Sequence, residues 1–441
     1  MAETAGIFYA AETLVEGAVA AAKGIYDPTL PLKVTLTPVK DVSLPRHSHT
    51  VSMVKGRAYI FGGITTGANG AETIADNGVH VIILPISATE GSDYKVIPAD
   101  NSSPAPRFGH SAVVIEDQIF IYGGSSDLSG ATLLDEQGAV WVFDTKTSKW
   151  TKLMPHDNVI PPLPVRLGHA SVATPQPRKP SRRTDEGLMP QLDADPAQPD
   201  ILPEPEEAAS FGTLIIRGGH PGSSKEADPL NDVWAFDIGA RTWSSLPSPP
   251  QLSHSTSASL AIVGSKLYTL TAGQIYTMTL ATQTFDDKAG QGALGITALS
   301  PWAPVSRSES GGPGNRAGAS LYPVTTGQGR NYLLLLGGGD GASGDIWTLQ
   351  LQPEGMTAAS IKDAARMAIG KGTGEKEWAE VRYFDEEGVM VQEGQDGRGI
   401  GARSAFAACK NADEDGGTVF VHGGLEGGQV RGDGMLVSVS I

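Results

Sequence analysis

The segment RFGHSAVVIEDQIFIYGG, residues 107–124, decides the fold of this chain, because it pairs two short runs of strand-forming residues around a polar turn. Two further runs follow it, AVWVFD at 139–144 and KWTKL at 149–153, with a Gly- and Ser-rich loop and a short turn between them. Short runs rich in β-branched and aromatic residues, bounded by turn residues, predict strands. Residues 106–153 are therefore expected to form one sheet of four antiparallel strands.

The same pattern recurs along most of the chain, so internal repetition determines the architecture. The repeats open at Arg46, Arg107, Arg166, Gln251, Arg316 and Arg403. Their second runs end in Gly62-Gly63, Gly123-Gly124, Gly218-Gly219, Ala272-Gly273, Gly337-Gly338 and Gly423-Gly424. Aromatic residues nine positions apart mark the third and fourth runs at Trp141/Trp150, Trp234/Trp243 and Tyr276/Phe285. Six copies in register predict six similar sheets.

A strand pair that ends in Gly-Gly, followed by two spaced aromatic residues, resembles the kelch repeat, which forms one blade of a β-propeller. The resemblance extends over residues 32–441 and implies an all-β fold, a six-bladed kelch propeller of the stand-alone type found in fungal genomes. It is specific to the fold and carries no activity by itself.

The two ends of the chain are expected to meet in one blade. Residues 1–31 are predicted to form a helical arm, with an amphipathic helix from Gly6 to Gly24, and residues 32–39 a strand. The final run, residues 435–441, matches a third strand and has no fourth strand after it. The N-terminal strand is therefore predicted to complete the sixth blade, which would close the ring without exposed edges at the join.

Two insertions interrupt the repeats. Residues 174–210 are rich in Pro, Asp, Glu and Arg and contain no aromatic residue, which predicts a flexible loop within the third blade. Residues 353–377 contain an alanine-rich segment followed by Gly370, which predicts a helix on the outside of the fifth blade.

Composition excludes several classes of protein. The formal net charge of −16 argues against nucleic-acid binding, which needs a basic surface. No apolar run is long enough to cross a membrane, and Glu3 and Glu12 stand where a signal peptide would carry basic residues, so we expect no membrane association. The single cysteine, Cys409, is typical of a reducing compartment, and the expected location is cytoplasmic.

The opening arginines are the candidate ligand-binding residues. Strand topology puts the repeat openings on the same face as the loops between second and third strands, and long loops over a propeller mouth commonly bind ligands. In well-studied kelch adaptors, arginines at the matching positions bind acidic peptide motifs; this resemblance implies a ligand-binding role for Arg46, Arg107, Arg166, Arg316 and Arg403. The alternative is that each arginine is a strut, paired with a carbonyl or an acid. Gln251 interrupts the pattern in the fourth blade.

Histidines and one tryptophan complete the candidate face. His49, His110 and His169 follow the openings at a fixed interval, as does His254, and Trp302 lies in a long connection on the same face. The histidines are interpreted mainly as structural residues of the repeat, although His47 and His49 would share one side of a strand and could suggest a metal. We expect no metal and no cofactor. The kelch-type copper radical oxidases need a cysteine crosslinked to tyrosine, and Cys409 ends an apolar run.

Two functions remain open at this point. The first is a binding module or adaptor that recognises a protein partner with an acidic motif, or a small carboxylated molecule, on the arginine-lined face. The second is a metal-free small-molecule enzyme, a cyclase or isomerase of a biosynthetic pathway, that uses the propeller funnel and works by orientation and preorganised electrostatics. No catalytic residue is identified, and whether the chain is an enzyme stays undecided.

Overall fold

The computed structural model describes residues 26, 28–67, 69–84, 91–156, 163–177, 212–222, 228–250, 259–285, 293–305, 312–326, 329–338, 344–355, 357–392, 398–411 and 417–440. The regular elements of these residues are strands, apart from one described helix, α2 (Ala358–Ala368). The prediction of an all-β fold is confirmed. The predicted N-terminal helix, Gln251, His254 and nearly all of the 174–210 insertion lie outside the described residues.

Five sheets are each formed by one continuous stretch of the chain. The first has β2 (Thr50–Val54), β3 (Arg57–Phe61), β6 (Val79–Ile83) and β7 (Asp93–Ile97), and the second has β8 (Ser111–Ile115), β9 (Gln118–Tyr122), β10 (Val140–Asp144) and β11 (Lys149–Leu153). The third has β12 (Ala170–Thr174), β13 (Thr213–Arg217), β14 (Val233–Asp237) and β15 (Thr242–Leu246). The fourth has β16 (Leu260–Val263), β17 (Lys266–Thr271), β18 (Gln274–Phe285), β19 (Ala293–Ala298) and the short β20 (Ala303–Pro304). The fifth has β21 (Ser320–Thr326), β22 (Arg330–Leu336), β23 (Ile346–Gln350) and β24 (Trp378–Glu380).

The sixth sheet joins both ends of the described chain in the order β25-β1-β31-β28-β27. Its strands are β27 (Ala407–Lys410), β28 (Thr418–His422), β31 (Gly434–Ser440), β1 (Lys33–Val39) and β25 (Arg382–Phe384). Small pairings outside these sheets involve β4 (Ile64–Thr66) with β5 (Glu72–Ile74), and β29 (Leu425–Glu426) with both β26 (Arg403–Ser404) and β30 (Gln429–Val430).

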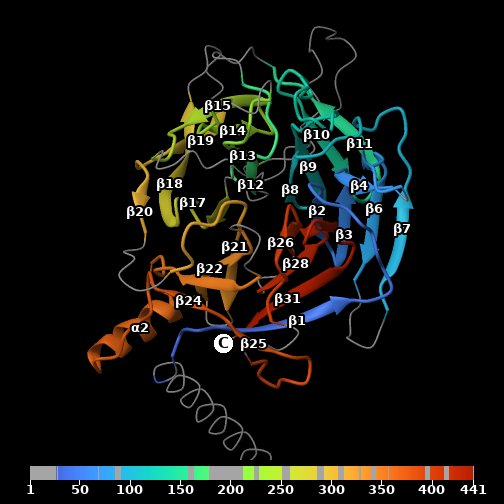
Figure 1. The fold of residues 1–441 in the computed structure, drawn as a ribbon. Coiled ribbons are helices and arrows are strands. Elements are labelled where there is room, and N and C mark those ends of the chain that lie inside the picture. The colour runs from blue at the N-terminus through green and yellow to red at the C-terminus, as the bar shows by residue number, and fades with distance from the viewer. Residues whose placement is uncertain are drawn as a thin grey trace, which may run out of the picture.

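The six sheets are arranged around a common centre (Figure 1). Their first strands contact one another in the order β2, β8, β12, β16, β21, β27 and back to β2. A central cavity of about 230 Å³ is lined by the beginnings of all six of these strands. Neighbouring backbones approach closely at the glycine doublets: a Cβ on Gly62, whose φ is +61°, would lie 2.3 Å from the carbonyl oxygen of Arg107 in the next sheet. Only glycine fits such a contact.

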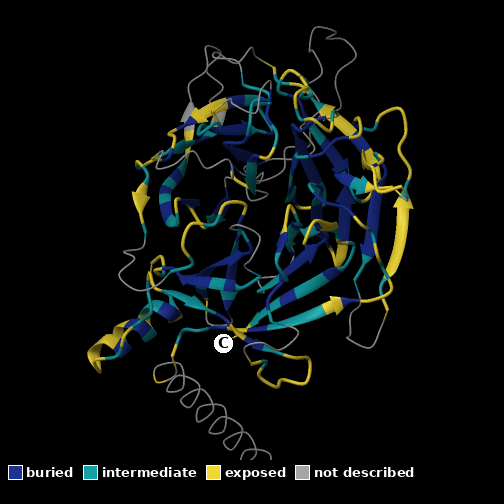
Figure 2. Cartoon of the chain, viewed as in Figure 1, coloured by how far each residue is buried: buried dark blue, intermediate teal, exposed yellow. Residues whose placement is uncertain are grey.

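The hydrophobic core consists of six clusters, and each lies at the seam between two neighbouring sheets. Buried residues accordingly follow the inner strands, whereas outer strands such as β7 are exposed (Figure 2). Aromatic side chains fill the seams, as where Trp243 of the third sheet packs on Tyr122 of the second with ring centroids 5.1 Å apart. Each sheet thus buries its faces on its neighbours, as the repeat predicts.

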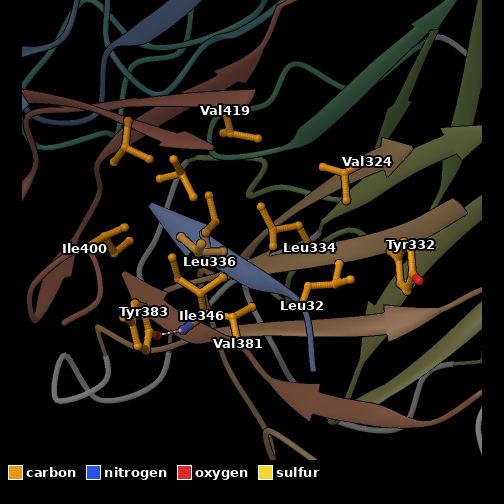
Figure 3. Packing of buried hydrophobic residues seen from close by; sticks show 13 residues of the cluster. Leu32, Val324, Tyr332, Leu334, Leu336, Ile346, Val381, Tyr383, Ile400 and Val419 are labelled. Carbon is orange, nitrogen blue, oxygen red and sulfur yellow. Dashed lines mark hydrogen bonds between the residues drawn. The ribbon is translucent and has the colours of Figure 1, made fainter. Parts of the chain in front are cut away.

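The strand β1 closes the sixth sheet, as predicted from the two ends of the sequence. It pairs antiparallel with β31 over seven residue pairs, from Lys33 with Ser440 to Val39 with Gly434. The sequence did not predict β25, which adds parallel to β1. Figure 3 shows the core beneath this junction, where Leu32 lies among residues of the fifth and sixth sheets and the Tyr383 hydroxyl accepts a hydrogen bond from the Ile346 N–H at 2.7 Å.

Helix α2 lies in the second insertion and extends from the edge of the fifth sheet (Figure 1). It begins at the N-cap Thr357, whose side chain accepts from the Ser360 N–H in a capping box. The Arg330 guanidinium of β22 binds Asp363 of the helix bidentately at 2.6 and 2.7 Å, and both side chains are 3% exposed. This buried ion pair fixes the helix to the sheet.

The fourth sheet departs from the repeat. Strand β18 continues from Gln274 to Phe285, so Tyr276 and Phe285 lie on the same strand and do not mark two neighbouring strands. The first half of β18 pairs with β17 and the second half with β19. The assignment of Phe285 to a fourth strand was therefore wrong: the short strand β20 pairs with β18 at Tyr276 and Thr277, whereas β19 pairs with the extension of β18 that contains Phe285.

Candidate interaction face

One end of the sheets gathers the repeat openings and the loops between second and third strands. We call this end the opening face; of the described residues it contains 43–49, 62–67, 69–78, 104–110, 123–139, 163–169, 218–222, 228–232 and the matching segments of the later sheets. Because the sheets are antiparallel, the turns between first and second strands and between third and fourth strands lie at the other end. We call that end the opposite face.

Each opening arginine is paired with a carboxylate of its own sheet that precedes the third strand. We call each pair an Arg–acid brace. The closest nitrogen-to-oxygen distances are 3.0 Å for Arg46–Asp76, 2.9 Å for Arg107–Glu136, 2.8 Å for Arg166–Asp232, 2.6 Å for Arg316–Asp345 and 3.0 Å for Arg403–Asp433. In each of these five sheets, the brace joins the start of the sheet to the loop between its second and third strands.

Most braces are anchored further by backbone and indole groups. Arg107 also donates to the Gly123 carbonyl at 3.1 Å, and Arg46, Arg166 and Arg403 make the same bond to the first glycine of their own doublets. The Trp141 indole donates to Glu136 at 2.7 Å. Trp234 and Trp347 donate in the same way to Asp232 and Asp345. The third-strand tryptophans therefore hold the carboxylates as well as fill the seams.

The charges of the braces are stabilised by their partners. Burial alone would raise the pKa of Glu136, but the hydrogen bonds from Arg107 and Trp141 leave it lowered. The pKa of Asp345 is lowered in the same way, against desolvation, by Arg316 and Trp347. Both carboxylates are thus ionised at neutral pH, and the guanidinium charges are compensated where they lie.

The structure gives the opening arginines the contacts of struts, which was the alternative that the sequence left open. Arg107 and Arg166 are fully buried, and Arg46 and Arg403 are 4% exposed. None of the five arginines is among the residues that line the central cavity. Sequence analysis missed the five acidic partners, although Asp232-Val233-Trp234 and Asp345-Ile346-Trp347 share an Asp-x-Trp pattern that could have indicated two of them.

The opening histidines connect neighbouring sheets. His110 Nε2 lies 2.8 Å from the Thr50 hydroxyl of the first sheet, and His169 Nε2 lies 2.7 Å from the Ser111 hydroxyl of the second. In the sixth sheet, Ala407 stands at the position of Thr50 and Ser111 and has no hydroxyl. His49 therefore bonds to His422 instead, with its Nε2 at 2.9 Å from the His422 Nδ1. The three histidines line the central cavity with their buried rings and hold three seams together.

These histidines are neutral in the folded protein. Desolvation lowers the pKa of His169 to about 3, helped by the nearby charge of Arg166. It lowers the pKa of His422 to about 4, and it places those of His49 and His110 well below the ordinary value. In the described ranges, no group of three or more His, Cys, Asp or Glu side chains is placed to hold a metal ion.

Trp302 lies apart from the central cavity. Its indole nitrogen donates to the Pro247 carbonyl at 2.7 Å, and its ring packs on the core between the third and fourth sheets. Its described contacts therefore bridge two sheets at the outer end of β15. Trp302 is not one of the residues that line the cavity.

Arg217 is a buried cation that the sequence analysis did not single out. It ends β13 and is 6% exposed; its guanidinium donates to the Thr269 hydroxyl at 2.5 Å, the Thr271 hydroxyl at 3.1 Å and the Asn231 amide oxygen at 3.2 Å. No carboxylate of the described residues pairs with it, and desolvation lowers its pKa to about 10. It occupies the seam beside the fourth sheet, where the repeat lacks its opening arginine.

Breaking one brace should destabilise the protein strongly. We expect Asp232→Ala to reduce the free energy of unfolding by about 3–5 kcal/mol, because it leaves the fully buried Arg166 charge without a counterion. Urea denaturation at pH 7.5 measures the change. Glu354→Ala is the control, since it removes the partly exposed pair with Lys266 and should change stability by less than about 1 kcal/mol. Equal effects of the two substitutions would contradict a structural role for the brace.

Comparison with known proteins matches part of the chain. The family model described as the KLHDC2/KLHL20/DRC7 kelch-repeats domain matches residues 32–177. Ras guanine nucleotide exchange factor F of Dictyostelium discoideum is 34% identical over 128 residues, which are 29% of this chain and 10% of that protein. Kelch domain-containing protein 3 of Bos taurus is 34% identical over 110 residues, which are 24% of this chain and 27% of that protein. The matches thus span about a quarter or less of these two relatives.

Among solved structures, that of YjhT covers 91% of this chain with a TM-score of 0.45 and 15% sequence identity. None of the described helices combines the length and the apolar character needed to cross a bilayer. The family-model match begins at the strand that closes the sixth sheet, and it extends over the first two sheets into the third. With the kelch relatives, this match shows that residues 32–177 carry kelch repeats, and the described sheets beyond residue 177 repeat the same antiparallel pattern.

Proposed function

We propose that residues 32–441 form one six-bladed kelch propeller and that its opening face is a protein-interaction surface. The observation that carries the proposal is the set of Arg–acid braces, which fix the loops of this face to the sheets beneath them. A rigid, loop-rich surface loses little conformational entropy when a partner binds. The single cysteine, Cys409, favours a module that works in the cytoplasm.

An acidic or carboxylate-bearing ligand is the finer form of this hypothesis. Such a ligand would have to displace the protein's own carboxylates, which already lie 2.6–3.0 Å from the opening arginines. The exchange is easiest at Arg46 and Arg403, because their partners Asp76 and Asp433 have side chains that are 58% and 41% exposed. The enzyme alternative has no comparable support, since the histidines at the central cavity use Nε2 to join neighbouring sheets.

Site-directed photocrosslinking in cells tests the interaction face. The photoreactive residue p-benzoylphenylalanine is placed singly at Leu128 and Gln137, which are exposed on the opening face, and at Thr147, which is exposed on the opposite face. We expect discrete protein adducts from the two opening-face positions and none of the same mass from Thr147. Adducts from Thr147 alone, or the same adducts from all three positions, would overturn the proposal.

A further inference from the structure

A pocket of about 440 Å³ lies on the opening face between the second and third sheets. Phe108 and Leu167, which each follow a brace arginine, lie in it, together with Leu128 and Ala131 of the loop after β9 and with His220 and Gly222 of the loop after β13. We call it the seam pocket. It is distinct from the central cavity, which no residue of the seam pocket lines.

The floor of the seam pocket is fixed by backbone hydrogen bonds. Phe108 and Ser125 exchange two N–H to carbonyl bonds of 3.0 Å each, and Leu167 and His220 exchange two of 3.0 and 2.8 Å. The Gly168 N–H donates to the Gly109 carbonyl at 2.7 Å, which ties the two openings together. The pocket is therefore formed before any ligand enters, which lowers the entropic cost of binding.

The lining is suited to an apolar side chain. Phe108, Leu128, Ala131 and Leu167 supply carbon surface, and Leu128 is a large aliphatic residue that is 43% exposed. An apolar concavity of this kind, with an exposed leucine in its wall, is typical of an interaction site. His220 contributes an imidazole to the lining, and its Nδ1 accepts a hydrogen bond from the Gly222 N–H at 3.3 Å.

The loop that supplies Leu128 and Ala131 to the pocket carries an excess of acid. Residues 125–139, all of them described, contain three carboxylates and no lysine or arginine. One of the three, Glu136, is neutralised by Arg107. Asp127, which is half-buried, and Asp135, which is exposed, leave negative charge on this loop, and we call these two residues the acidic rim. A cationic partner complements such a rim, whereas an acidic partner is repelled by it.

We propose that the seam pocket binds an aliphatic or aromatic side chain of a protein segment that carries lysine or arginine beside it. This inference rests on the proposed interaction face and specifies the chemistry of the partner. The apolar side chain fills the pocket between Phe108, Leu128 and Leu167, and the neighbouring cation pairs with the acidic rim that includes Asp135. The partner is therefore basic, the opposite sign from the acidic motif that the arginine pattern suggested.

An oriented peptide library tests the proposal. Nine-residue peptides with a fixed central Leu, Phe, Met, Ser or Glu and degenerate flanks are passed over the immobilised full chain, and retained peptides are sequenced. We expect enrichment of the apolar centres and of Lys or Arg in the flanks. The best peptide is then resynthesised with a fluorescent label, and its Kd is measured by anisotropy at low and physiological salt.

Matched variants assign the binding to the pocket. Leu128→Ser should raise the Kd about tenfold, because it removes buried apolar contact, while Leu299→Ser, at another exposed leucine outside the pocket, should leave it within about twofold. Asp135→Lys should raise the Kd about tenfold at low salt and less at physiological salt, with Asp93→Lys of the outer strand β7 as control. Circular dichroism melts confirm that all four variants fold.

The outcomes separate this inference from the proposed face. Enrichment of acidic flanks, no enrichment at all, or a Kd that Leu128→Ser and Asp135→Lys leave unchanged would overturn the seam-pocket proposal. If photocrosslinks from Leu128 or Gln137 persist in that case, the interaction face stands and only its chemistry is wrong. If those crosslinks are absent as well, both proposals fail.

Discussion

A chain that lacks residues 1–39 is expected to lose cooperative thermal unfolding. The deletion removes β1, and with it seven residue pairs to β31 and the parallel pairing with β25. It also removes Leu32 and Val34, which are fully buried between the fifth and sixth sheets, and each such side chain stabilises the fold by about 1.5–3 kcal/mol. These losses approach the whole stability of a typical domain, about 5–15 kcal/mol.

Two controls make this result specific to the strand. Deletion of residues 1–25 leaves β1 and Leu32 in place and should preserve a single sharp transition. A synthetic peptide of residues 28–40, added to the shorter chain, should restore cooperative melting in a concentration-dependent manner. A sharp transition of the 1–39 deletion at the temperature of the full chain would show that β1 does not hold the ring together.

The second large effect is expected on acidification: the free energy of unfolding should fall steeply between pH 6.5 and pH 5. His49, His110, His169 and His422 are buried and their pKa values are lowered by desolvation, to about 3 for His169 and about 4 for His422. In the unfolded chain each histidine binds a proton near pH 6.5, so below that pH the unfolded state gains protons that the folded state does not. Stability therefore rises with pH across this window.

The magnitude follows from the linkage relation. A histidine that stays neutral in the folded state costs roughly 1 to 2 kcal/mol of stability at pH 5.5, and the four together cost roughly 6 kcal/mol. The braced carboxylates affect stability at lower pH. The pKa values of Glu136 and Asp345 are lowered in the folded protein, so their stabilisation is lost only when the pH falls below the pKa of an ordinary carboxyl group. The window from pH 6.5 to 5 therefore reports mainly on the histidines.

Urea denaturation at several pH values measures the slope. His110→Gln keeps an amide that can hydrogen-bond to the Thr50 hydroxyl and cannot titrate, so it should reduce the slope by roughly 1 kcal/mol per pH unit. His156→Gln is the control, because the residue is exposed and its bond to the third sheet is made by its backbone N–H; this substitution should change the slope much less. A flat profile from pH 7.5 to 5 for the natural chain would mean that these rings bind protons in the folded state as readily as in the unfolded state, which contradicts their burial as neutral groups.

The sequence predicted the features that depend on local repetition. The glycine doublet, as in Gly62-Gly63, and the aromatic pair nine residues apart, as in Trp141/Trp150, recur along the sequence because a sheet needs a close approach at one point and a large ring at another. The closing role of residues 32–39 could also be predicted, since one strand lacked a partner at each end of the chain. These conclusions required the order of strands but no knowledge of side-chain contacts.

Long-range contacts could not be predicted in this way. The strand β25 comes from the connection after the fifth sheet and pairs with β1, and no repeated residue marks it. The charge state of the opening face was missed for a similar reason: Arg107 was visible in the repeat, but Glu136 lies 29 residues away in a loop of variable length. A repeated arginine indicated a cationic face, whereas the paired side chains leave acid in excess around the seam pocket.

The closure by β1 also sets the order in which this protein can fold during its synthesis. Among the described strands, β1 leaves the ribosome first and β31 last, so the pairing that completes the sixth sheet waits until residues 434–440 have been made. Until then, the edge of β1 that pairs with β31 is open, and the adjoining Leu32 lacks the part of its core that the sixth sheet supplies. The early strand is therefore exposed to wrong pairing with other nascent chains while the five intervening sheets are synthesised.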